Sequence, residues 1–207
     1  MMKRNERRRV QGDHFDALLD LASSCSRQGR IDEAIDYYHQ ALSVRPDCES
    51  ARDNLGLLLA SVGRLPEAIA NFQHAISLQP QLADAHYSLA LTLQSQGLLA
   101  DAIDHYQHAV DLKPNHLLAR IELGNCLVDD GQLSEALDQA EMLVHFIRQP
   151  SFPHFRFAML LVRCDCIDVA RASFETYLAQ YPDDREGARQ VMAGLGLAPL
   201  SDHAAPA

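Results

Sequence analysis

The sequence contains no tryptophan, and aromatic residues make up only 6% of it. It has no apolar run that approaches the ~20 residues that a membrane-spanning helix requires. The 207 residues are nevertheless 47% apolar, mostly because of leucine and alanine. A chain of this length and composition is sufficient for a substantial buried core, and the prevalence of leucine and alanine favours helices.

The chain also lacks the features of a secreted protein. Its basic start is not followed by an apolar segment, which argues against a secretory signal. The number of cysteines is odd and their spacing is not that of a disulfide framework. We therefore expect free thiols in a reducing compartment and a cytoplasmic protein. The cysteines are Cys25, Cys48, Cys126, Cys164 and Cys166.

Positive charge is scarce outside the amino terminus. The whole chain has a net charge of −10, whereas residues 1–10 carry +4, so the remaining residues carry −14. A body this acidic repels nucleic acid, and we predict no nucleic-acid groove. We expect residues 1–12 to be a disordered basic tail, and contact of this tail with an acidic surface is the alternative.

Signatures of catalysis are missing as well. The sequence has no G-x-S-x-G, no P-loop and no G-x-G-x-x-G after a strand. His74, His105 and His108 suggest a surface metal site, but no cysteine or carboxylate completes a plausible tetrahedron. Cys164 and Cys166 flank a turn, where we interpret them as small semi-buried residues rather than a redox pair. We predict no catalytic residue, no metal, no cofactor and no enzymatic activity.

What the sequence does contain is a phrase that recurs every 34 residues. A fourth copy begins at Gly131, and the phase continues beyond Asp165, where aspartate replaces glycine. Aspartate accepts left-handed backbone better than most residues, so we expect the turn to persist there. The first three copies are GRIDEAIDYYHQALSVRP (29–46), GRLPEAIANFQHAISLQP (63–80) and GLLADAIDHYQHAVDLKP (97–114).

Each copy is typical of two helices joined by a short turn. Apolar residues before each glycine are spaced by three, one and three, which places them on one helix face. Small residues after the glycine allow the paired helices to approach closely, and proline ends the second helix. One such pair cannot bury its apolar face alone, so consecutive pairs must stack.

This pattern resembles the tetratricopeptide repeat family over about residues 15–184. The resemblance implies an all-α, right-handed α-solenoid with a C-terminal cap helix. The sequence departs from the family in lacking its common tryptophan, in having Ala140 at an aromatic position, and in having Arg148 where proline is expected. Pro150 and Pro153 follow instead, and we expect an irregularity there.

The same resemblance gives the domain organisation. We predict five repeats within residues 13–184, a cap helix at 185–197 and a disordered tail at 198–207. The repeats span about residues 15–48, 49–82, 83–116, 117–150 and 151–184.

In this family the first helices of the repeats line a concave groove. By matching positions we predict a partner-binding groove, although some of its side chains could instead belong to the core. The mixture of apolar and acidic side chains favours a peptide or helix with apolar anchors and basic flanks. The predicted residues are Asp53, Leu57, Tyr87, Leu91, Leu118, Ile121, Asn125, Val128, Phe155 and Met159.

We therefore predict a non-enzymatic scaffold or adaptor that binds a protein segment. Two alternatives stay open. The chain could be a recruitment or regulatory subunit of a separate enzyme, such as a glycosyltransferase or methyltransferase, or it could self-assemble into a homo-oligomer. Binding of a chaperone's terminal carboxylate is not expected, because the inner face of the first three repeats lacks the clustered cations that such binding needs.

Overall fold

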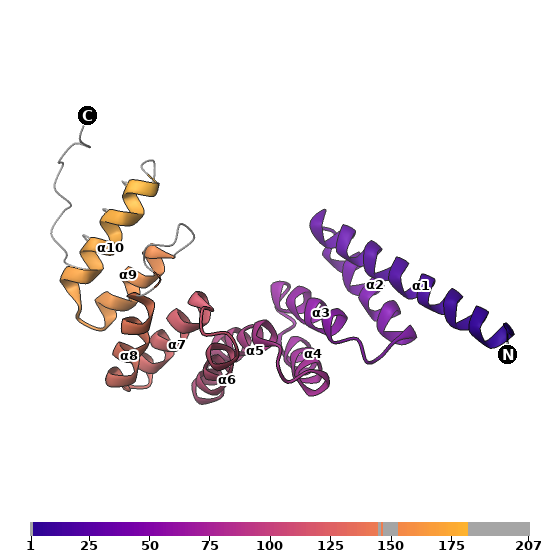
Figure 1. The fold of residues 1–207 in the computed structure, drawn as a ribbon, viewed down its shortest axis with the longest axis horizontal. Helices are drawn as coiled ribbons and strands as arrows, with labels where there is room; N and C mark the ends of the chain where they lie inside the picture. Colours follow the sequence, from indigo (N-terminus) through magenta and orange to yellow (C-terminus); the bar gives the residue numbers. More distant parts are fainter. Residues whose placement is uncertain (1, 145, 147–152, 182–207) are drawn as a thin grey trace. The chain divides into compact units, whose positions relative to one another are not determined.

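The computed structural model describes residues 2–144, 146 and 153–181. These residues form ten α-helices and, within this part of the chain, no strand (Figure 1). Short turns join the helices in five consecutive pairs, which confirms the predicted all-α class of stacked helix-turn-helix repeats. The chain divides into two compact units, Met1–Lys113 and Pro114–Ala207, which we call the amino half and the carboxyl half.

The amino half contains three helix pairs. Each first helix packs on the second helix of its own pair, and α2 packs on α3 as α4 packs on α5. The elements are α1 (Met2–Arg27), α2 (Ile31–Val44), α3 (Glu49–Ser61), α4 (Leu65–Leu78), α5 (Ala83–Ser95) and α6 (Leu99–Leu112).

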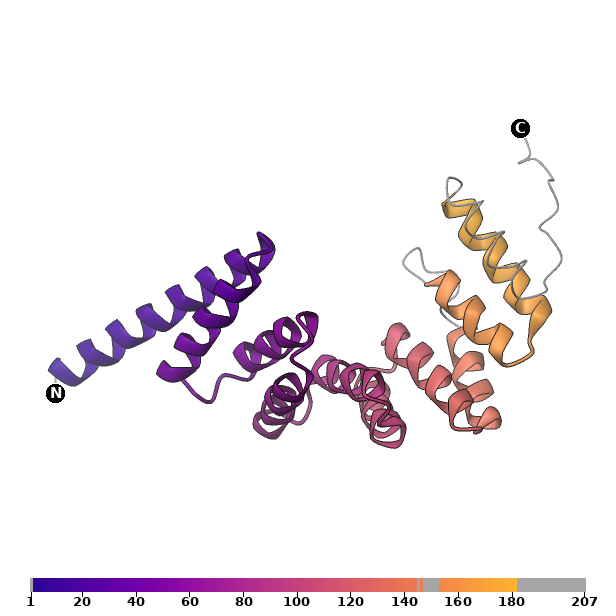
Figure 2. The ribbon, with the colours of Figure 1, turned by 180° about the vertical axis from the view of Figure 1, so that it is seen from behind.

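The carboxyl half contains two helix pairs, seen from the opposite side in Figure 2. Within it, α9 packs against both α7 and α8 of the preceding pair. The elements are α7 (Leu117–Asp129), α8 (Leu133–Val144), α9 (His154–Arg163) and α10 (Ile167–Gln180).

The core is built from the repeated small and aromatic positions. Ala68, Phe72 and Ala75 of α4 are fully buried, and the matching residues of α2, α6 and α10 are buried too. Gly56 of α3 lies so close to Phe72 that an added Cβ would be 2.7 Å from the ring. The absence of a side chain at position 56 therefore lets α3 and α4 approach closely.

The turn between the paired helices has the same left-handed backbone in all five pairs. The glycines at the first four turns have φ values between 75° and 80°, and Asp165 has φ 60° at the fifth. The structure thus confirms that the turn persists where aspartate replaces glycine. Bulky residues avoid this region of backbone space, whereas aspartate tolerates it.

One prediction about the amino terminus is wrong. Residues 2–12 were expected to be disordered, but α1 begins at Met2. This segment contains lysine, arginine and glutamate, which are strong helix formers, and no proline. Extension of a helix that is already nucleated by its packed carboxyl end is easier than starting a new one.

The expected irregularity near Pro150 lies mostly outside the described residues. Pro153 is the N-cap residue of α9, which begins at His154. The repeat phase of α3, α5 and α7 would start this helix at position 151, so α9 starts three residues late. The predicted cap helix at 185–197 and tail at 198–207 also lie outside the described residues.

Candidate functional site

Four of the predicted groove residues lie on α3 and α5 of the amino half. Leu57 and Leu91 are large apolar side chains that are 46% and 37% exposed. Asp53 and Tyr87 are half-buried. We call Asp53, Leu57, Tyr87 and Leu91 the amino-half face, which combines exposed apolar surface with one carboxylate.

Asp53 is the electrostatic feature of the amino-half face. Its Oδ1 atom is shielded from solvent and has no hydrogen-bond partner among the described residues. Burial, and secondarily the nearby negative charge of Asp84, raise the pKa of Asp53 to about 6. Asp84 itself is paired with Lys113, whose Nζ lies 3.3 Å from Oδ1 of Asp84. The cation at this place therefore serves Asp84, and the demand of the Asp53 carboxylate for a donor is unmet.

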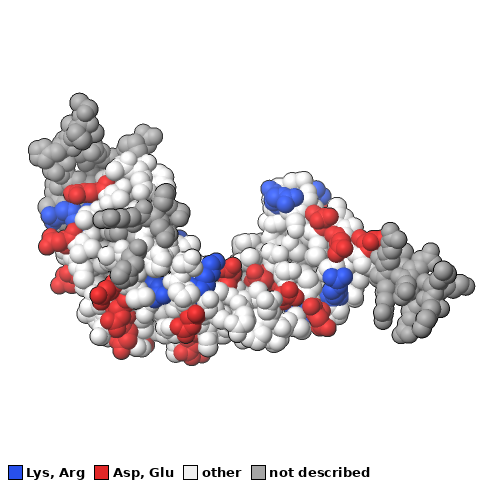
Figure 3. Space-filling model, viewed as in Figure 1, with Lys and Arg blue, Asp and Glu red and all other residues white. Residues whose placement is uncertain are grey.

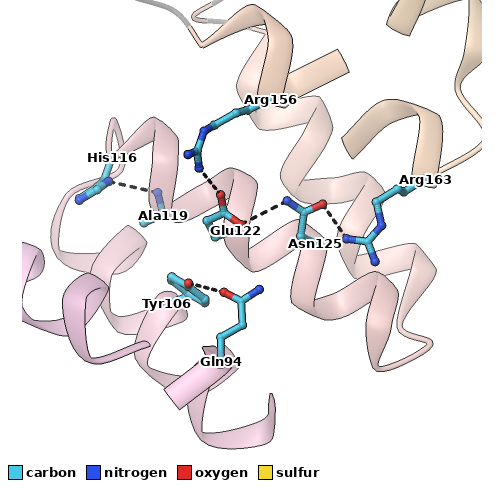
Figure 4. Close-up of polar contacts among 8 residues, drawn as sticks. All are labelled: Gln94, Tyr106, His116, Ala119, Glu122, Asn125, Arg156 and Arg163. Atoms are coloured by element: carbon cyan, nitrogen blue, oxygen red, sulfur yellow. Dashed lines mark hydrogen bonds and ion pairs between the residues drawn. The ribbon is translucent and has the colours of Figure 1, made fainter. Parts of the chain in front are cut away.

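Tyr87 is held in place by its neighbours on α5 and α6. Its ring lies 5.9 Å from the ring of Tyr106, measured between centroids. The Tyr106 hydroxyl donates a hydrogen bond of 2.7 Å to Oε1 of Gln94, as Figure 4 shows. Because Tyr106 is fully buried, these contacts give the amino-half face a rigid aromatic support.

The carboxyl half holds the other predicted residues on α7 and α9. Leu118 is exposed. Asn125, Val128, Phe155 and Met159 are half-buried, and Phe155 packs edge-on against Phe174 of the local core. We call the five residues Leu118, Asn125, Val128, Phe155 and Met159 the carboxyl-half face.

Ile121 is the predicted groove residue that the structure contradicts. Its side chain is completely buried, so it belongs to the core and is not presented to a partner. The buried residues of α7 are seven in number, because α8 and α9 both pack against this helix. The face that α7 leaves open is therefore narrower than the family resemblance implies.

A ladder of polar contacts joins α7 to α9 across the carboxyl-half face (Figure 4). Arg156 donates to Oε1 of Glu122 at 2.6 Å, and Asn125 donates to Oε2 of Glu122 at 3.4 Å. Arg163 donates to Oδ1 of Asn125 at 2.8 Å and forms an ion pair with Asp129. The acids on this side of α7 are thus neutralised by arginines of α9.

Sequence reasoning identified only Asn125 in this ladder. A usable signal was present, because Glu122 and Arg156 are 34 residues apart, as are Asp129 and Arg163. Opposite charges at one repeat interval indicate pairing between adjacent first helices. The matching residues in the amino half, Asn54 with Ser88 and Ser61 with Ser95, are uncharged.

On the face that Figure 3 shows, acidic side chains are more widespread than basic ones, in agreement with the net charge of −10. Such a surface attracts cationic segments and accelerates their association. Among the described residues, no helix is long and apolar enough to cross a membrane.

The residues considered for chemistry do not form a reactive centre in the described part of the chain. No group of three or more histidine, cysteine, aspartate or glutamate side chains there is arranged to hold a metal ion. Burial raises the pKa of Cys126 to about 12, and it also raises the pKa of Cys164. Both thiols are therefore protonated at neutral pH and are poor nucleophiles.

Comparison with protein families finds three models described as tetratricopeptide repeat. They match residues 13–81, 54–116 and 93–152, and together they extend from residue 13 to residue 152. A search of curated proteins finds no match.

Solved structures with a similar fold include other helical repeat proteins. A MamA protein matches with a TM-score of 0.66 and 21% identity, over 92% of this chain and all of MamA. YrrB, described as a TPR protein with an unusual peptide-binding site, has a TM-score of 0.62 and 22% identity, over 80% of this chain and 86% of YrrB. The first TPR of Spaghetti (RPAP3), bound to the HSP90 peptide SRMEEVD, has a TM-score of 0.54 and 21% identity, over 61% of this chain and 94% of that one.

Proposed function

We propose that this chain, which belongs to the tetratricopeptide repeat family, is an interaction scaffold that binds a basic protein segment with apolar anchors. The binding surface is the amino-half face. The observation that carries this proposal is the carboxylate of Asp53, which has a solvent-shielded oxygen without a hydrogen-bond partner beside exposed leucines.

A lysine or arginine of the partner would satisfy the Asp53 carboxylate. Hydrogen bonds between ionised groups contribute about 1.5–3 kcal/mol, more than neutral ones. The free chain already bears the cost of burying this carboxylate, as its raised pKa indicates. The bound cation therefore relieves a penalty that exists before binding, which favours a basic segment over an acidic one.

The leucines supply the apolar anchoring. Covering the exposed parts of Leu57 and Leu91 contributes roughly 1 kcal/mol each, a fraction of the ~1.5–3 kcal/mol for burying a whole side chain. Tyr87 adds a firmly held ring between them and the α5–α6 core. Because the helices hold these side chains in place, little ordering entropy is lost on binding.

The carboxyl-half face is proposed as a separate contact surface. Leu118, Val128, Phe155 and Met159 offer apolar contacts there, while Asn125 is already hydrogen-bonded to Arg163. Its charges are neutralised within the chain, so it contributes packing rather than charge recognition.

The related structures support the interaction role by analogy. YrrB has a peptide-binding site, and the RPAP3 repeat is bound to a peptide with two glutamates and an aspartate. The amino-half face of the present chain has an acidic group instead of a cationic cluster, so the segment that we propose has the opposite charge.

A defined probe tests this proposal. We would titrate the chain with a fluorescein-labelled peptide of repeated Leu-Lys-Ala triplets, and with a counterpart in which each lysine is replaced by glutamate. We expect binding of the lysine peptide only, and at least about tenfold weaker binding by the Leu57→Asp, Leu91→Asp double variant. Equal binding of the two peptides, or no effect of the double variant, would contradict the proposal.

The two alternative functions differ in what occupies the surface. Affinity purification from the native host, followed by mass spectrometry, would recover an enzyme if the chain is a recruitment subunit. Light scattering at several concentrations would show a concentration-dependent mass if the chain self-assembles. A scaffold for a separate non-enzymatic protein predicts neither result.

A further inference from the structure

Three histidines of the third helix pair lie together in the amino half. His86 of α5 is only 6% exposed, and its Nδ1 lies 3.1 Å from Nδ1 of His105 on α6. Its other ring nitrogen, Nε2, lies 3.3 Å from the carbonyl oxygen of Pro80. The ring of His108 is centred 5.2 Å from that of His86 and 6.3 Å from that of His105.

These contacts determine where the protons lie. A carbonyl oxygen only accepts, so Nε2 of His86 carries a proton and donates it to Pro80. In neutral His86, Nδ1 is then an acceptor, and His105 must donate from its own Nδ1. The pair can take up one further proton and keep an Nδ1–H···Nδ1 hydrogen bond. A second added proton places two N–H groups against each other and breaks it.

The neighbouring repeats have the same contact without a titratable pair. Arg52 of α3 donates from Nε to the Pro46 carbonyl at 3.0 Å. Arg120 of α7 donates to the Pro114 carbonyl at 3.1 Å.

The second member of the pair has an equivalent too. Arg120 also donates to Oε1 of Gln139 at 2.7 Å, and Arg120 and Gln139 stand 34 residues after His86 and His105. The connection between α5 and α6 is therefore the histidine version of a link that α7 and α8 make with arginine and glutamine.

We propose that the His86–His105 pair, with His108 beside it, is an acid-sensitive latch that closes the α5–α6 helix pair at neutral pH and loosens it below about pH 6.5, where histidine ordinarily becomes protonated. The geometry is a buried ring with both nitrogens engaged and two further imidazoles within reach. Tyr87 follows His86 on α5 and its ring contacts Tyr106 on α6, so loosening reaches the proposed binding face. The latch itself does not depend on that function.

The surrounding charges agree in sign. Burial, followed by the charges of His105 and His108, lowers the pKa of His86, although the Pro80 carbonyl opposes this. Burial and then His108 lower the pKa of His105, while Asp104 and Asp101 of α6 act against them. The side of the pair towards α4 contributes the Pro80 carbonyl of the α4–α5 connection.

A lowered histidine pKa means that the unfolded chain binds protons first as the pH falls. Stability contributed by the latch is therefore complete above about pH 6.5 and is lost progressively below it.

Exchange of the two links provides the test. We would measure the melting temperature between pH 5 and pH 8 for the wild type and for the His86→Arg, His105→Gln double variant, which copies the Arg120–Gln139 pair. We expect the wild type to lose roughly 2–4 °C more than the double variant on acidification, the size of change that one weakened interaction gives in a chain of this length. His74→Gln, at the exposed position that matches His108 one repeat earlier, is the control and should behave as wild type.

A second measurement does not depend on the variants folding. Nitrogen NMR of the wild-type imidazole rings should show the Nε2–H tautomer for His86 and the Nδ1–H tautomer for His105 at neutral pH. Equal pH dependence of the wild type and a folded double variant would overturn the proposal, as would two histidines that titrate independently with ordinary pKa values.

Discussion

The amino-half face and the carboxyl-half face are built on equivalent helices but treat their charges differently. On α7, Glu122 and Asp129 are paired with Arg156 and Arg163 of the next first helix. On α3, the buried oxygen of Asp53 has no hydrogen-bond partner among the described residues. The repeats are thus alike in architecture, and the difference lies in whether the chain satisfies its own acids.

This difference indicates which face is suited to recognition. An acid that is satisfied internally holds two helices together, and a partner's cation would have to displace an arginine to reach it. An acid that is buried without a donor destabilises the free chain and gains most from an incoming cation. The architecture positions both faces, and a few side chains decide which of them is available for binding.

The largest effect that we expect concerns how tightly the helix pairs pack in each half. A Cβ at Gly56 would meet the Phe72 ring at 2.7 Å, whereas a Cβ at Gly124 would meet the Leu160 side chain at 2.8 Å. A ring moves less easily than the end of a leucine. We expect Gly56→Ala to destabilise the chain by about 2 kcal/mol, and Gly124→Ala to be nearly neutral because improved helix propensity offsets a smaller strain.

Denaturant unfolding followed by circular dichroism would measure both glycine variants. Equal losses of stability in the two variants would show that the halves are equally tight at these crossings, contrary to the comparison.

A smaller effect is expected at the fifth turn, which differs from the glycine turns of the amino half. Asp165 adopts φ 60°, a conformation that is unfavourable for a residue with a side chain. We expect Asp165→Gly to stabilise the chain by about 0.5–1 kcal/mol, and Gly131→Asp to destabilise it by a similar amount. Thermal unfolding of the two variants measures this, and stabilisation by both or by neither would contradict the account.

The smallest expected effect on stability comes from the arginine ladder. The Arg156→Gln, Arg163→Gln double variant should lose less than about 1 kcal/mol, because exposed ion pairs are weak. It should also make the carboxyl half resemble the amino half, by releasing Glu122 and Asp129 for an external cation. We expect a few-fold gain in affinity for the lysine peptide, measured by anisotropy. Unchanged affinity would mean that an unsatisfied acid is insufficient for recognition.

The repeated features of the fold were predictable from the sequence because one period encodes them. The helix pairs follow from the apolar spacing, and the turn at Asp165 follows from the continued phase and the tolerance of aspartate for left-handed backbone. The start of α1 was predicted wrongly, because charge suggested a tail where the residues are also strong helix formers.

The site was less predictable, because a repeat position does not determine exposure or pairing. Ile121 occupies a groove position by phase, yet it is buried by the packing on α7. The pairing of Arg163 with Asp129 depends on how α9 lies against α7. Likewise, the unmet hydrogen bond of Asp53 depends on which side chains reach it, and sequence spacing alone does not reveal this.

The most direct test of the account is the Asp53→Asn variant, measured both for stability and for binding of the lysine peptide. Because the pKa of Asp53 is raised to about 6, its carboxylate destabilises the folded chain fully above pH 6, and this penalty fades as the pH falls towards 4. After allowance for partial exposure, we expect the variant to be about 1 kcal/mol more stable at pH 7.5. It should bind the peptide at least about tenfold more weakly, with Asp84→Asn, whose carboxylate is served by Lys113, as the matched control. A more stable variant with unchanged affinity would show that Asp53 is only a local strain, and the central claim would fail.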